Sequence, residues 1–544
     1  MREPSAAILA DAVRLRAEQS PDFDVVTFEH ASLDGGATPD ERRSYAQLAE
    51  RANRIAAALL ARNVARGDRF ALMMRNHPEF VETMIAASIT GAVFVPIDPR
   101  TRRDKLAFLL RDSGCRGAIC ADYALAELLA AQERGPALEW ILALDTGEEA
   151  GSMRGADAPG VGTLAEVLDR PAETIDSRLE SANDPLQILF TSGTTGDPKG
   201  VVWPNARFGA FAGLGALLGY RPDERPYTGL SLTHGNAQAV TLGPSLALGL
   251  HCVLSRRFTK SKLWDVCRHH GCTTFSMLGG MATAIYGEPP RADDADHPVR
   301  FVVSAGMPVT LWEAFEKRFG VGIFEWYGAV EGGLALKPIG QGPIGSFGRP
   351  LPGLEMKILD DQDRECPPGV QGEICSRPMG GRAEVEYHGN PEASAAKTRA
   401  GWLRSGDVGH SDADGWLFFD HRKGGGIRRN GDFVNPGFVE KVLAEHPAVS
   451  DVFVYGVPSA SGAPGEKDVV AAIVAAPDTR WDRGVSASVF EHCRKGLEPN
   501  FVPSFLQVVD EIPKTASEKP QERFLLERFA PDAPGVFREE RAPR

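Results

Sequence analysis

The sequence has little that would fix it in a membrane or cross-link it outside a cell. Among its 544 residues there are only eight cysteines, and they are scattered along the chain. The longest uncharged stretch, residues 229–255, is interrupted by polar residues such as His234 and Asn236, which is typical of buried core. The first twenty residues carry too many charges for an export signal. We therefore expect a reducing, cytoplasmic location, with no membrane span.

Positive charge is also in short supply. Sixty Lys and Arg residues against 73 Asp and Glu residues give a formal net charge of −13. A protein that follows nucleic-acid phosphates needs a basic face, so the composition argues against a nucleic-acid partner. The expected partner is a small molecule, and the sequence leaves open whether the chain forms a homodimer.

One cluster of cysteine and histidine is a candidate metal site. Cys267, His269, His270 and Cys272 lie within six residues, but their spacing suits neither a zinc finger nor a zinc ribbon. An apolar helical pattern precedes them and Gly271 follows. The sequence therefore favours a helix end, with the cysteines in the core and the histidines complementing the helix dipole.

The order of apolar patterns predicts an α/β fold. From residue 40 to about 340, helical patterns alternate with short strand-like runs, as in doubly wound parallel sheets covered by helices. Residues 134–160 are rich in Gly, Ala and Asp, and we expect a mobile excursion there. Short strands with Gly and Pro turns begin at residue 341 and predict a small β-rich subdomain.

A change in composition and apolar pattern near Arg422 predicts a domain boundary. The segment HRKGGGIRR (421–429) places three glycines between basic residues, as in a linker. About 120 residues with their own apolar periodicity follow it. We therefore expect a large N-terminal domain, residues 1–421, and a small, mobile α+β domain, residues 422–544.

The segment TSGTTGDPKG (191–200) is the most informative stretch of the chain. It follows an apolar strand and combines glycines, hydroxyls and Lys199. Glycines let backbone N–H groups approach phosphate oxygens, while hydroxyls and a lysine add donors and charge. It is not a Walker loop, because Lys199 is followed by Gly200 and not by Ser or Thr. We interpret it as a phosphate-binding loop.

At this segment the chain resembles the adenylate-forming enzymes, which include acyl-CoA synthetases, aryl-CoA ligases, nonribosomal adenylation domains and luciferases. The resemblance runs from about Tyr45 to Arg523. Within the family, the sequence is most similar to the carnitine/crotonobetaine-CoA ligase branch. The segments that carry it, besides the phosphate loop, are GDR (67–69), NHPEF (76–80), AVFVPIDP (92–99), LTHGNAQ (232–238), SAGMP (304–308), EWYGAVEG (325–332), GWLRSGD (401–407) and PKTASEK (513–519).

The resemblance implies a nucleotide site built from several of these segments. The residues that would enclose the β- and γ-phosphates of ATP are Thr191, Ser192, Gly193, Thr194, Thr195, Gly196 and Lys199. Those that would contact adenine and ribose are Gly306, Met307, Pro308, Tyr327, Gly328, Asp407 and Arg422. Among these, Tyr327 would stack on adenine, and Asp407 would accept both ribose hydroxyls.

The resemblance also implies three catalytic residues. Lys519 would bridge the acyl carboxylate and the α-phosphate, while Lys199 would hold the β- and γ-phosphates. Glu331 would hold Mg²⁺, which prefers oxygen ligands. ATP, Mg²⁺ and coenzyme A are the implied cofactors and co-substrates.

Further roles depend on a rotation of the C-terminal domain between the two steps of the reaction. Gly431 matches the glycine that serves the coenzyme A step, and Gly424, the first of three glycines, is the expected hinge. His234 stands where relatives border the acyl pocket, yet a single histidine is as often a packed core residue, so both interpretations stay open.

Three departures from the family pattern stand out. Val330 replaces the usual Thr or Ser before the magnesium glutamate, so a hydroxyl that would bond the α-phosphate is missing. Glu518 replaces the usual glycine before the catalytic lysine. Residues 202–205 lack the common Thr-His or Ser-His pair.

The implied function is an AMP-forming acyl-CoA ligase, which makes acyl-AMP with release of pyrophosphate and then an acyl-CoA thioester. Fixed positive groups stabilise the charge that moves onto the leaving pyrophosphate. Two alternatives stay open: a free-standing adenylation enzyme that loads a carrier protein, and a non-catalytic nucleotide-binding relative. The sequence does not identify the carboxylic acid.

Overall fold

A computed structural model describes residues 3–148, 153–171, 173–191, 198–423, 427–429, 432–434, 436–459, 467–497, 499–515 and 518–539. Contacts within the chain define two compact units. The first unit comprises Met1–Ser276 and Glu384–Thr398, and the second comprises Met277–Ala383 and Arg399–Arg544. The segment 384–398 thus returns to the first unit after the chain has entered the second.

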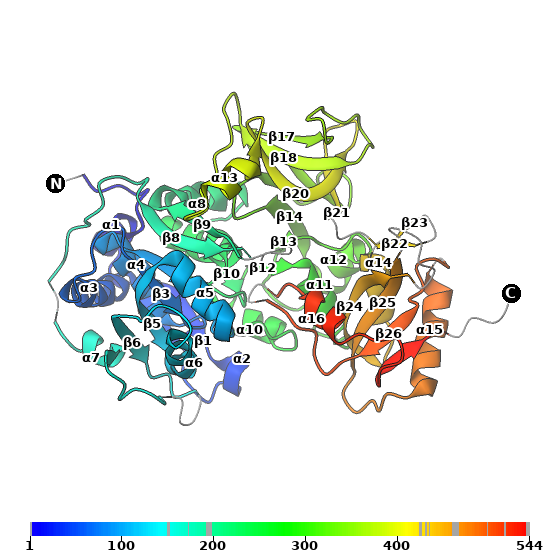
Figure 1. Cartoon of the computed structure of the whole chain (residues 1–544), viewed down its shortest axis with the longest axis horizontal. Coiled ribbons are helices and arrows are strands. Elements are labelled where there is room, and N and C mark those ends of the chain that lie inside the picture. Colours follow the sequence, from blue (N-terminus) through cyan, green and yellow to red (C-terminus); the bar gives the residue numbers. More distant parts are fainter. Residues whose placement is uncertain are drawn as a thin grey trace. The chain divides into compact units, whose positions relative to one another are not determined.

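A seven-stranded, largely parallel sheet forms one core of the first unit (Figure 1). All its neighbouring strands are parallel except the last pair, β8 and β9. In sheet order the strands are β7 (Val161–Thr163), β6 (Trp140–Leu144), β5 (Cys115–Ala121), β3 (Arg69–Met73), β4 (Val93–Pro96), β8 (Pro185–Phe190) and β9 (Gly200–Pro204).

Helices cover both faces of this sheet, as the alternating pattern predicts. Ala71 and Met73 of β3 pack into one buried cluster with residues of α5 (Arg103–Ser113) and α6 (Asp122–Gln132). On the opposite face, Phe80 of α4 (Pro78–Thr90) contacts Phe94 of β4 edge to face, with ring centres 6.4 Å apart. The remaining helices before the phosphate loop are α1 (Leu9–Gln19), α2 (Ala31–Asp34), α3 (Tyr45–Ala61) and α7 (Leu164–Leu168).

A second set of paired strands in the first unit comes from both sides of the phosphate loop in the sequence. Its strands, in order, are β2 (Glu41–Ser44), β1 (Asp24–Glu29), β11 (Cys252–Ser255), β10 (Pro226–Thr228) and β12 (Thr274–Leu278). The remaining helical segments of the first unit are α8 (Asn205–Leu217), the π-helix η1 (Ala237–Leu242), α9 (Gly243–Leu248), α10 (Leu263–His270) and α13 (Pro391–Lys397).

The second unit begins as an α/β structure and continues into antiparallel strands. The strands β13 and β14 are parallel, and every later neighbouring pair in the sheet is antiparallel. The strands are β13 (Phe301–Ala305), β14 (Gly322–Gly328), β15 (Leu334–Lys337), β16 (Ser346–Pro350), β21 (Leu417–Arg422), β20 (Trp402–Ser411), β18 (Gly372–Pro378) and β17 (Leu354–Leu359). Two helices accompany them, α11 (Gly279–Tyr286) and α12 (Trp312–Phe319). The β-rich region predicted after residue 341 is confirmed.

The C-terminal part of the second unit has its own small sheet and core. The helices α14 (Pro436–Ala444) and α15 (Arg483–Gly496) pack on one face, while Leu525 of α16 (Glu522–Glu527) packs on the other. The four strands are β24 (Val449–Pro458), β25 (Lys467–Ala475), β26 (Phe505–Val508) and β27 (Val536–Arg538), and a separate pair consists of β22 (Ile427–Arg429) and β23 (Asp432–Val434). The predicted fold class, α/β with a smaller α+β part at the C-terminal end, is confirmed.

One expectation about the first unit is wrong. Within the predicted excursion 134–160, residues Trp140–Leu144 form the buried strand β6, which pairs in parallel with β5. The apolar run WILAL forms a buried strand even though the sequence on either side is rich in Gly, Ala and Asp.

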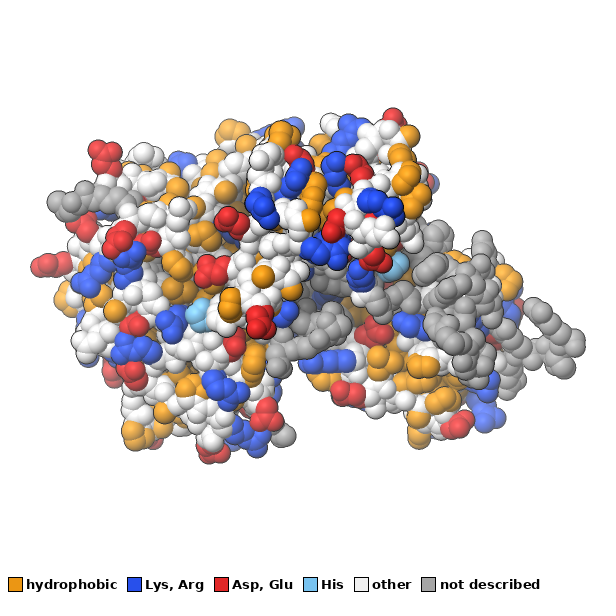
Figure 2. Space-filling model, turned by 45° about the horizontal axis from the view of Figure 1, so that its top comes forward, with side chains coloured by type: hydrophobic (Ala, Val, Ile, Leu, Met, Phe, Trp, Pro, Cys, Tyr) orange, Lys and Arg blue, Asp and Glu red, His pale blue; other side chains and the backbone are white. Residues whose placement is uncertain are grey.

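The surface carries charges of both signs. On the face shown in Figure 2, the described Lys and Arg side chains alternate with Asp and Glu side chains and do not form one basic patch. No helix among the described residues combines the length and apolarity that crossing a bilayer requires.

Candidate active site

The phosphate loop connects two antiparallel strands of the first unit. The register pairs Phe190 at the end of β8 with Gly200 at the start of β9, and the Thr191 N–H donates to the Lys199 carbonyl at 2.9 Å. The loop therefore leads into a strand and not into a helix, which agrees with the prediction that it is not a Walker loop. Ser192, Gly193, Thr194, Thr195 and Gly196 lie outside the described residues.

The lysine of this loop rests against an aromatic ring from a distant part of the sequence. The Lys199 Nζ lies 5.4 Å from the centre of the buried Tyr387 ring, within range of a cation–π interaction. The segment that bears this ring is fixed to β9, because the His388 N–H donates to the Gly200 carbonyl at 2.8 Å. The sequence analysis missed Tyr387, and no local signal marks it, since its contact is made only by the return of residues 384–398 to the first unit.

The turn predicted to line the adenine is held by a buried carboxylate of the second unit. Glu325 on β14 accepts hydrogen bonds from the N–H groups of Gly306 and Met307, the latter at 3.1 Å. Burial raises the pKa of the Glu325 carboxyl to about 8. Gly306 has φ +85°, which favours glycine, and a Cβ on Gly279 would meet the Gly306 carbonyl at 2.1 Å. Glu325 is the first residue of the segment EWYGAVEG, but the sequence analysis assigned it no role.

The predicted adenine and ribose residues are in direct contact with each other. The Tyr327 hydroxyl donates to Asp407 Oδ2 at 2.7 Å, linking β14 to β20. The Asp407 N–H donates to Ser405 Oγ at 2.9 Å, which fixes the backbone at this carboxylate. The Tyr327 ring stacks on Phe347, with centres 4.5 Å apart and planes 28° apart. Phe347 therefore covers one face of the ring that was predicted to stack on adenine.

The predicted magnesium ligand sits in a tight turn between antiparallel strands. Gly328 ends β14, and mutual backbone hydrogen bonds join Ala329 and Gly332, so Val330 and Glu331 occupy the tip of the connection to β15. The valine therefore stands directly beside the carboxylate, at the position where relatives of the family place a hydroxyl.

A compact hairpin presents Lys519. The Thr515 N–H donates to the Lys519 carbonyl at 2.8 Å, and the Lys519 N–H donates to Thr515 Oγ1 at 3.1 Å. The hairpin is anchored at its base by the ion pair of Lys514 Nζ with Asp451 Oδ2 at 2.7 Å. Glu518 adopts φ +57°, a left-handed conformation that explains why glycine is usual at this position.

The remaining predicted residues are only partly placed. Met307 is buried and Pro308 follows it at the start of a turn towards α12. Arg422 ends β21 with its backbone paired to Asp407, but its side chain is not among the described parts of the chain. Gly424 and Gly431 lie outside the described residues as well.

The segment predicted to border the acyl pocket contains a second polar residue that the sequence analysis did not select. His234 is half-buried, and its N–H closes a turn by donating to the Ser231 carbonyl at 3.0 Å. Two residues later, Asn236 is 5% exposed, and neither Nδ2 nor Oδ1 of its amide has a hydrogen-bond partner among the described residues. A Cβ on the intervening Gly235 would meet the Trp203 ring at 2.8 Å, so the backbone here passes closely over that indole.

Comparisons with known proteins cover nearly the whole chain. A family model described as AMP-binding enzyme matches residues 13–380, and one described as AMP-binding enzyme C-terminal domain matches residues 439–519. The crotonobetaine/carnitine–CoA ligase of Salmonella choleraesuis (strain SC-B67) is 29% identical over 487 residues, which covers 88% of this chain and 91% of that protein. The same enzyme of Salmonella paratyphi C has the same identity and coverage.

Solved structures also match over nearly the whole chain. An anthranilate CoA ligase in complex with anthranoyl-AMP superposes with a TM-score of 0.79 at 24% identity, over 96% of each chain. A benzoate CoA ligase from Burkholderia xenovorans LB400 superposes with a TM-score of 0.77 at 23% identity, over 95% of this chain and 99% of that one. Both similarities concern the fold.

Proposed function

The chain belongs to the AMP-binding enzyme family, and on that premise we propose which of its residues perform an ATP-dependent acyl-CoA ligase reaction. In the first step a carboxylate oxygen attacks the α-phosphorus of ATP, which gives acyl-AMP and pyrophosphate. In the second step the thiol of coenzyme A attacks the acyl carbon, and AMP leaves. The observation that carries the assignment is the pair of family matches, which together span residues 13–380 and 439–519.

The second unit would bind the nucleoside. The hydrogen bond from Tyr327 to Asp407 supports this role, because it positions a ring for adenine beside a carboxylate for the ribose hydroxyls. Phe347 covers one face of Tyr327, so adenine would stack on the other. Glu325 would act indirectly, by holding the backbone at Gly306 and Met307.

The charged residues would stabilise the pyrophosphate as it leaves. Lys199, held against Tyr387, would contact the β- and γ-phosphates together with the loop 191–196. Mg²⁺ enters as the MgATP substrate, and Glu331 at the tip of its turn offers the carboxylate oxygen that this ion prefers. Lys519 would neutralise the carboxylate and the α-phosphate as they approach each other.

We place the domain boundary at residue 422, as the glycine run predicts, with residues 422–544 rotating between the two steps and Gly424 as the pivot. The separate matches of the two family models, on either side of this run, support the boundary. In the second step the rotation would withdraw Lys519 and bring Gly431 to the thiol.

The acyl pocket would recognise a polar group on the acid through Asn236. A buried amide without a partner destabilises a protein by about 1–3 kcal/mol, and a hydrogen-bonding substituent of the bound acid would satisfy it. His234, two residues earlier, would border the same pocket. Replacing Asn236 with Leu should raise KM for a polar acid by about 10-fold or more, with a small effect on an apolar acid of equal size; equal effects on both acids would contradict this role.

The test of the proposed function is a panel of carboxylates scored for AMP formation with and without coenzyme A. The relatives, which are CoA ligases of crotonobetaine or carnitine, anthranilate and benzoate, indicate which acids to begin with. We expect AMP and the acyl-CoA thioester to form together when acid, ATP, Mg²⁺ and coenzyme A are present. AMP formation that requires a carrier protein in place of coenzyme A would favour the carrier-loading alternative.

The cytoplasm supplies both ATP and coenzyme A, and we propose it as the site of action. A homodimer, which the sequence leaves open, would appear as twice the chain mass in sedimentation.

A further inference from the structure

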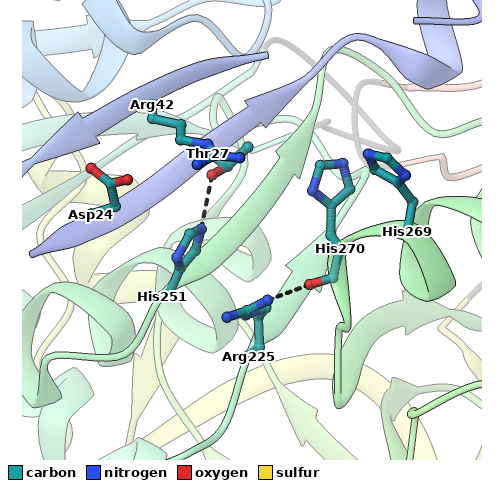
Figure 3. Close-up of a pocket in the computed structure, with 7 residues that line it drawn as sticks. All are labelled: Asp24, Thr27, Arg42, Arg225, His251, His269 and His270. Carbon is teal, nitrogen blue, oxygen red and sulfur yellow. Dashed lines mark hydrogen bonds between the residues drawn. The ribbon is translucent and has the colours of Figure 1, made fainter.

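A cavity of about 300 Å³ in the first unit collects histidines from two separate parts of the chain. It lies between β1 and β2 on one side and the end of α10 on the other, and the proposed reaction does not use it. Its lining residues are Asp24, Thr27, Arg42, Arg225, His251, His269 and His270 (Figure 3).

Two of these histidines converge with a carboxylate at the rim of the cavity. One nitrogen from His269, one from His270 and one carboxylate oxygen from Asp40 all lie within 4.8 Å of one another. In Figure 3 both rings project from the end of α10 towards the same side. His270 Nε2 lies 3.6 Å from Asp40 Oδ2.

The ring of His270 is placed to bind something other than the protein. Its side chain is only 9% exposed, and Nε2 makes no hydrogen bond to any residue that the structure describes. A buried imidazole nitrogen usually has a hydrogen-bond partner, and within the described part of the chain Nε2 has only the longer ion-pair contact with Asp40. A cation held between the three groups would bind this nitrogen directly.

The backbone that carries these ligands is fixed on both sides. At the end of α10, Gly271 takes a left-handed conformation, and Arg225 Nη1 donates to the His270 carbonyl at 2.6 Å. On the other side, the His30 N–H donates to Asp40 Oδ1 at 3.0 Å, which orients the carboxylate and leaves Oδ2 towards the histidine. Such outer contacts are what position the ligands of a metal.

We propose that Asp40, His269 and His270 bind a divalent first-row transition ion such as Zn²⁺, Co²⁺ or Ni²⁺. Two imidazoles and one carboxylate suit these ions, whereas Mg²⁺ prefers an all-oxygen set. Ligand atoms around a tetrahedral ion are about 3–3.5 Å apart, so the exposed His269 must turn inward slightly. The bound ion would tie the β1–β2 connection to the end of α10.

The charges around the site allow a cation. Arg42 and Arg225 are the two guanidinium groups of the cavity, and Asp24 and Asp40 offset them. Arg225 is committed to the His270 carbonyl. An anion at the same point would meet the Asp40 carboxylate, which argues for a metal over a phosphate.

The sequence analysis considered a metal at this helix end with the two cysteines as partners, and favoured a helix end without one. Cys267 and Cys272 are fully buried, as the sequence predicts, and neither belongs to the group of converging ligand atoms. The third ligand comes instead from Asp40, more than two hundred residues away in the chain.

The test is calorimetric titration of the chelator-treated full chain with Zn²⁺, together with the visible spectrum of the Co²⁺ form, which reports coordinated nitrogen. We expect about one ion per chain, and a melting temperature that rises with Zn²⁺ concentration. Asp40→Asn keeps the volume of the side chain and should weaken binding by at least 10-fold to 100-fold, the loss expected even from an outer partner. His270→Ala should abolish the Co²⁺ bands.

The control is His446→Ala, because His446 and His492 form another close histidine pair, with ring centres 5.4 Å apart in the second unit. It should bind Zn²⁺ as the unaltered chain does. If His270→Ala does not fold, Asp40→Asn decides the question. Failure of the unaltered chain to bind Zn²⁺, unchanged affinity in Asp40→Asn, or stabilisation by phosphate in place of Zn²⁺ would overturn the assignment.

Discussion

Glu325 offers a direct test of how the proposed nucleotide pocket is built. Its carboxyl is buried, accepts hydrogen bonds from the Gly306 and Met307 N–H groups, and has its pKa raised by burial to about 8. Glu325→Gln keeps an oxygen acceptor for those two N–H groups but removes the titrating proton. We expect the variant to lose a pH dependence of stability that the unaltered chain shows.

The sign of this pH dependence follows from which state, folded or unfolded, holds the Glu325 proton more tightly. The folded chain keeps it up to about pH 8, whereas the ordinary value for an unfolded glutamate is 4.5. Between these values the folded state binds more protons, so the free energy of unfolding falls as pH rises. At about 1.4 kcal/mol per pH unit, the full shift sets a ceiling of ~5 kcal/mol, reached only above pH 8.

The assay is urea unfolding of both chains at pH 6 and pH 9. At pH 6 Glu325→Gln should already be the more stable by up to about 2 kcal/mol, because the unfolded glutamate is ionised there while the folded one keeps its proton. By pH 9 this advantage should grow towards the ceiling of ~5 kcal/mol. Glu313→Gln, on the exposed side of α12, is the matched control and should keep the pH dependence of the unaltered chain. Parallel pH curves for Glu325→Gln and the unaltered chain would refute the reasoning.

Four further changes probe the proposed site. Lys519→Ala should lower the adenylation rate by about 10²–10³-fold and spare thioester formation from supplied acyl-AMP; equal loss of both steps would make Lys519 structural. Val330→Thr restores a hydroxyl beside Glu331 and should retain or improve adenylation, whereas a large loss in folded protein would mean that the valine packs against the acyl group. Gly424→Pro should spare adenylation and impair thioester formation, with Gly426→Pro as its comparison, and similar losses of both steps in both variants would contradict the hinge. Glu518→Gly should keep full adenylation while Glu518→Val lowers it, because φ +57° excludes a β-branched residue; identical rates would show that this backbone is not constrained.

The fold class and the family could be predicted because their signals are local. The phosphate loop 191–200 has a composition that few other functions need, and the alternation of apolar runs predicts parallel strands such as β3, β4 and β5. The strand β6 was missed because its apolar run has only five residues and is surrounded by glycine-rich and acidic sequence.

Residues that act through tertiary contacts could not be predicted in the same way. Tyr387 reaches Lys199 only because residues 384–398 return to the first unit, and Glu325 serves the Gly306 turn from a neighbouring strand. Asp40 lies close to His270 only in the folded chain, because the two residues belong to segments far apart in the sequence. Each of these contacts joins segments whose spacing carries no periodic signal.

The most direct test of the central claim is exchange of labelled pyrophosphate into ATP in the absence of coenzyme A. An enzyme that forms acyl-AMP reversibly exchanges pyrophosphate only when its carboxylate is present, so the exchange isolates the first step from the thiol acceptor. We expect exchange that depends on both the acid and Mg²⁺, and that is lost in Lys519→Ala. Binding of ATP without exchange for any acid of the panel would contradict the account and indicate a non-catalytic nucleotide-binding relative.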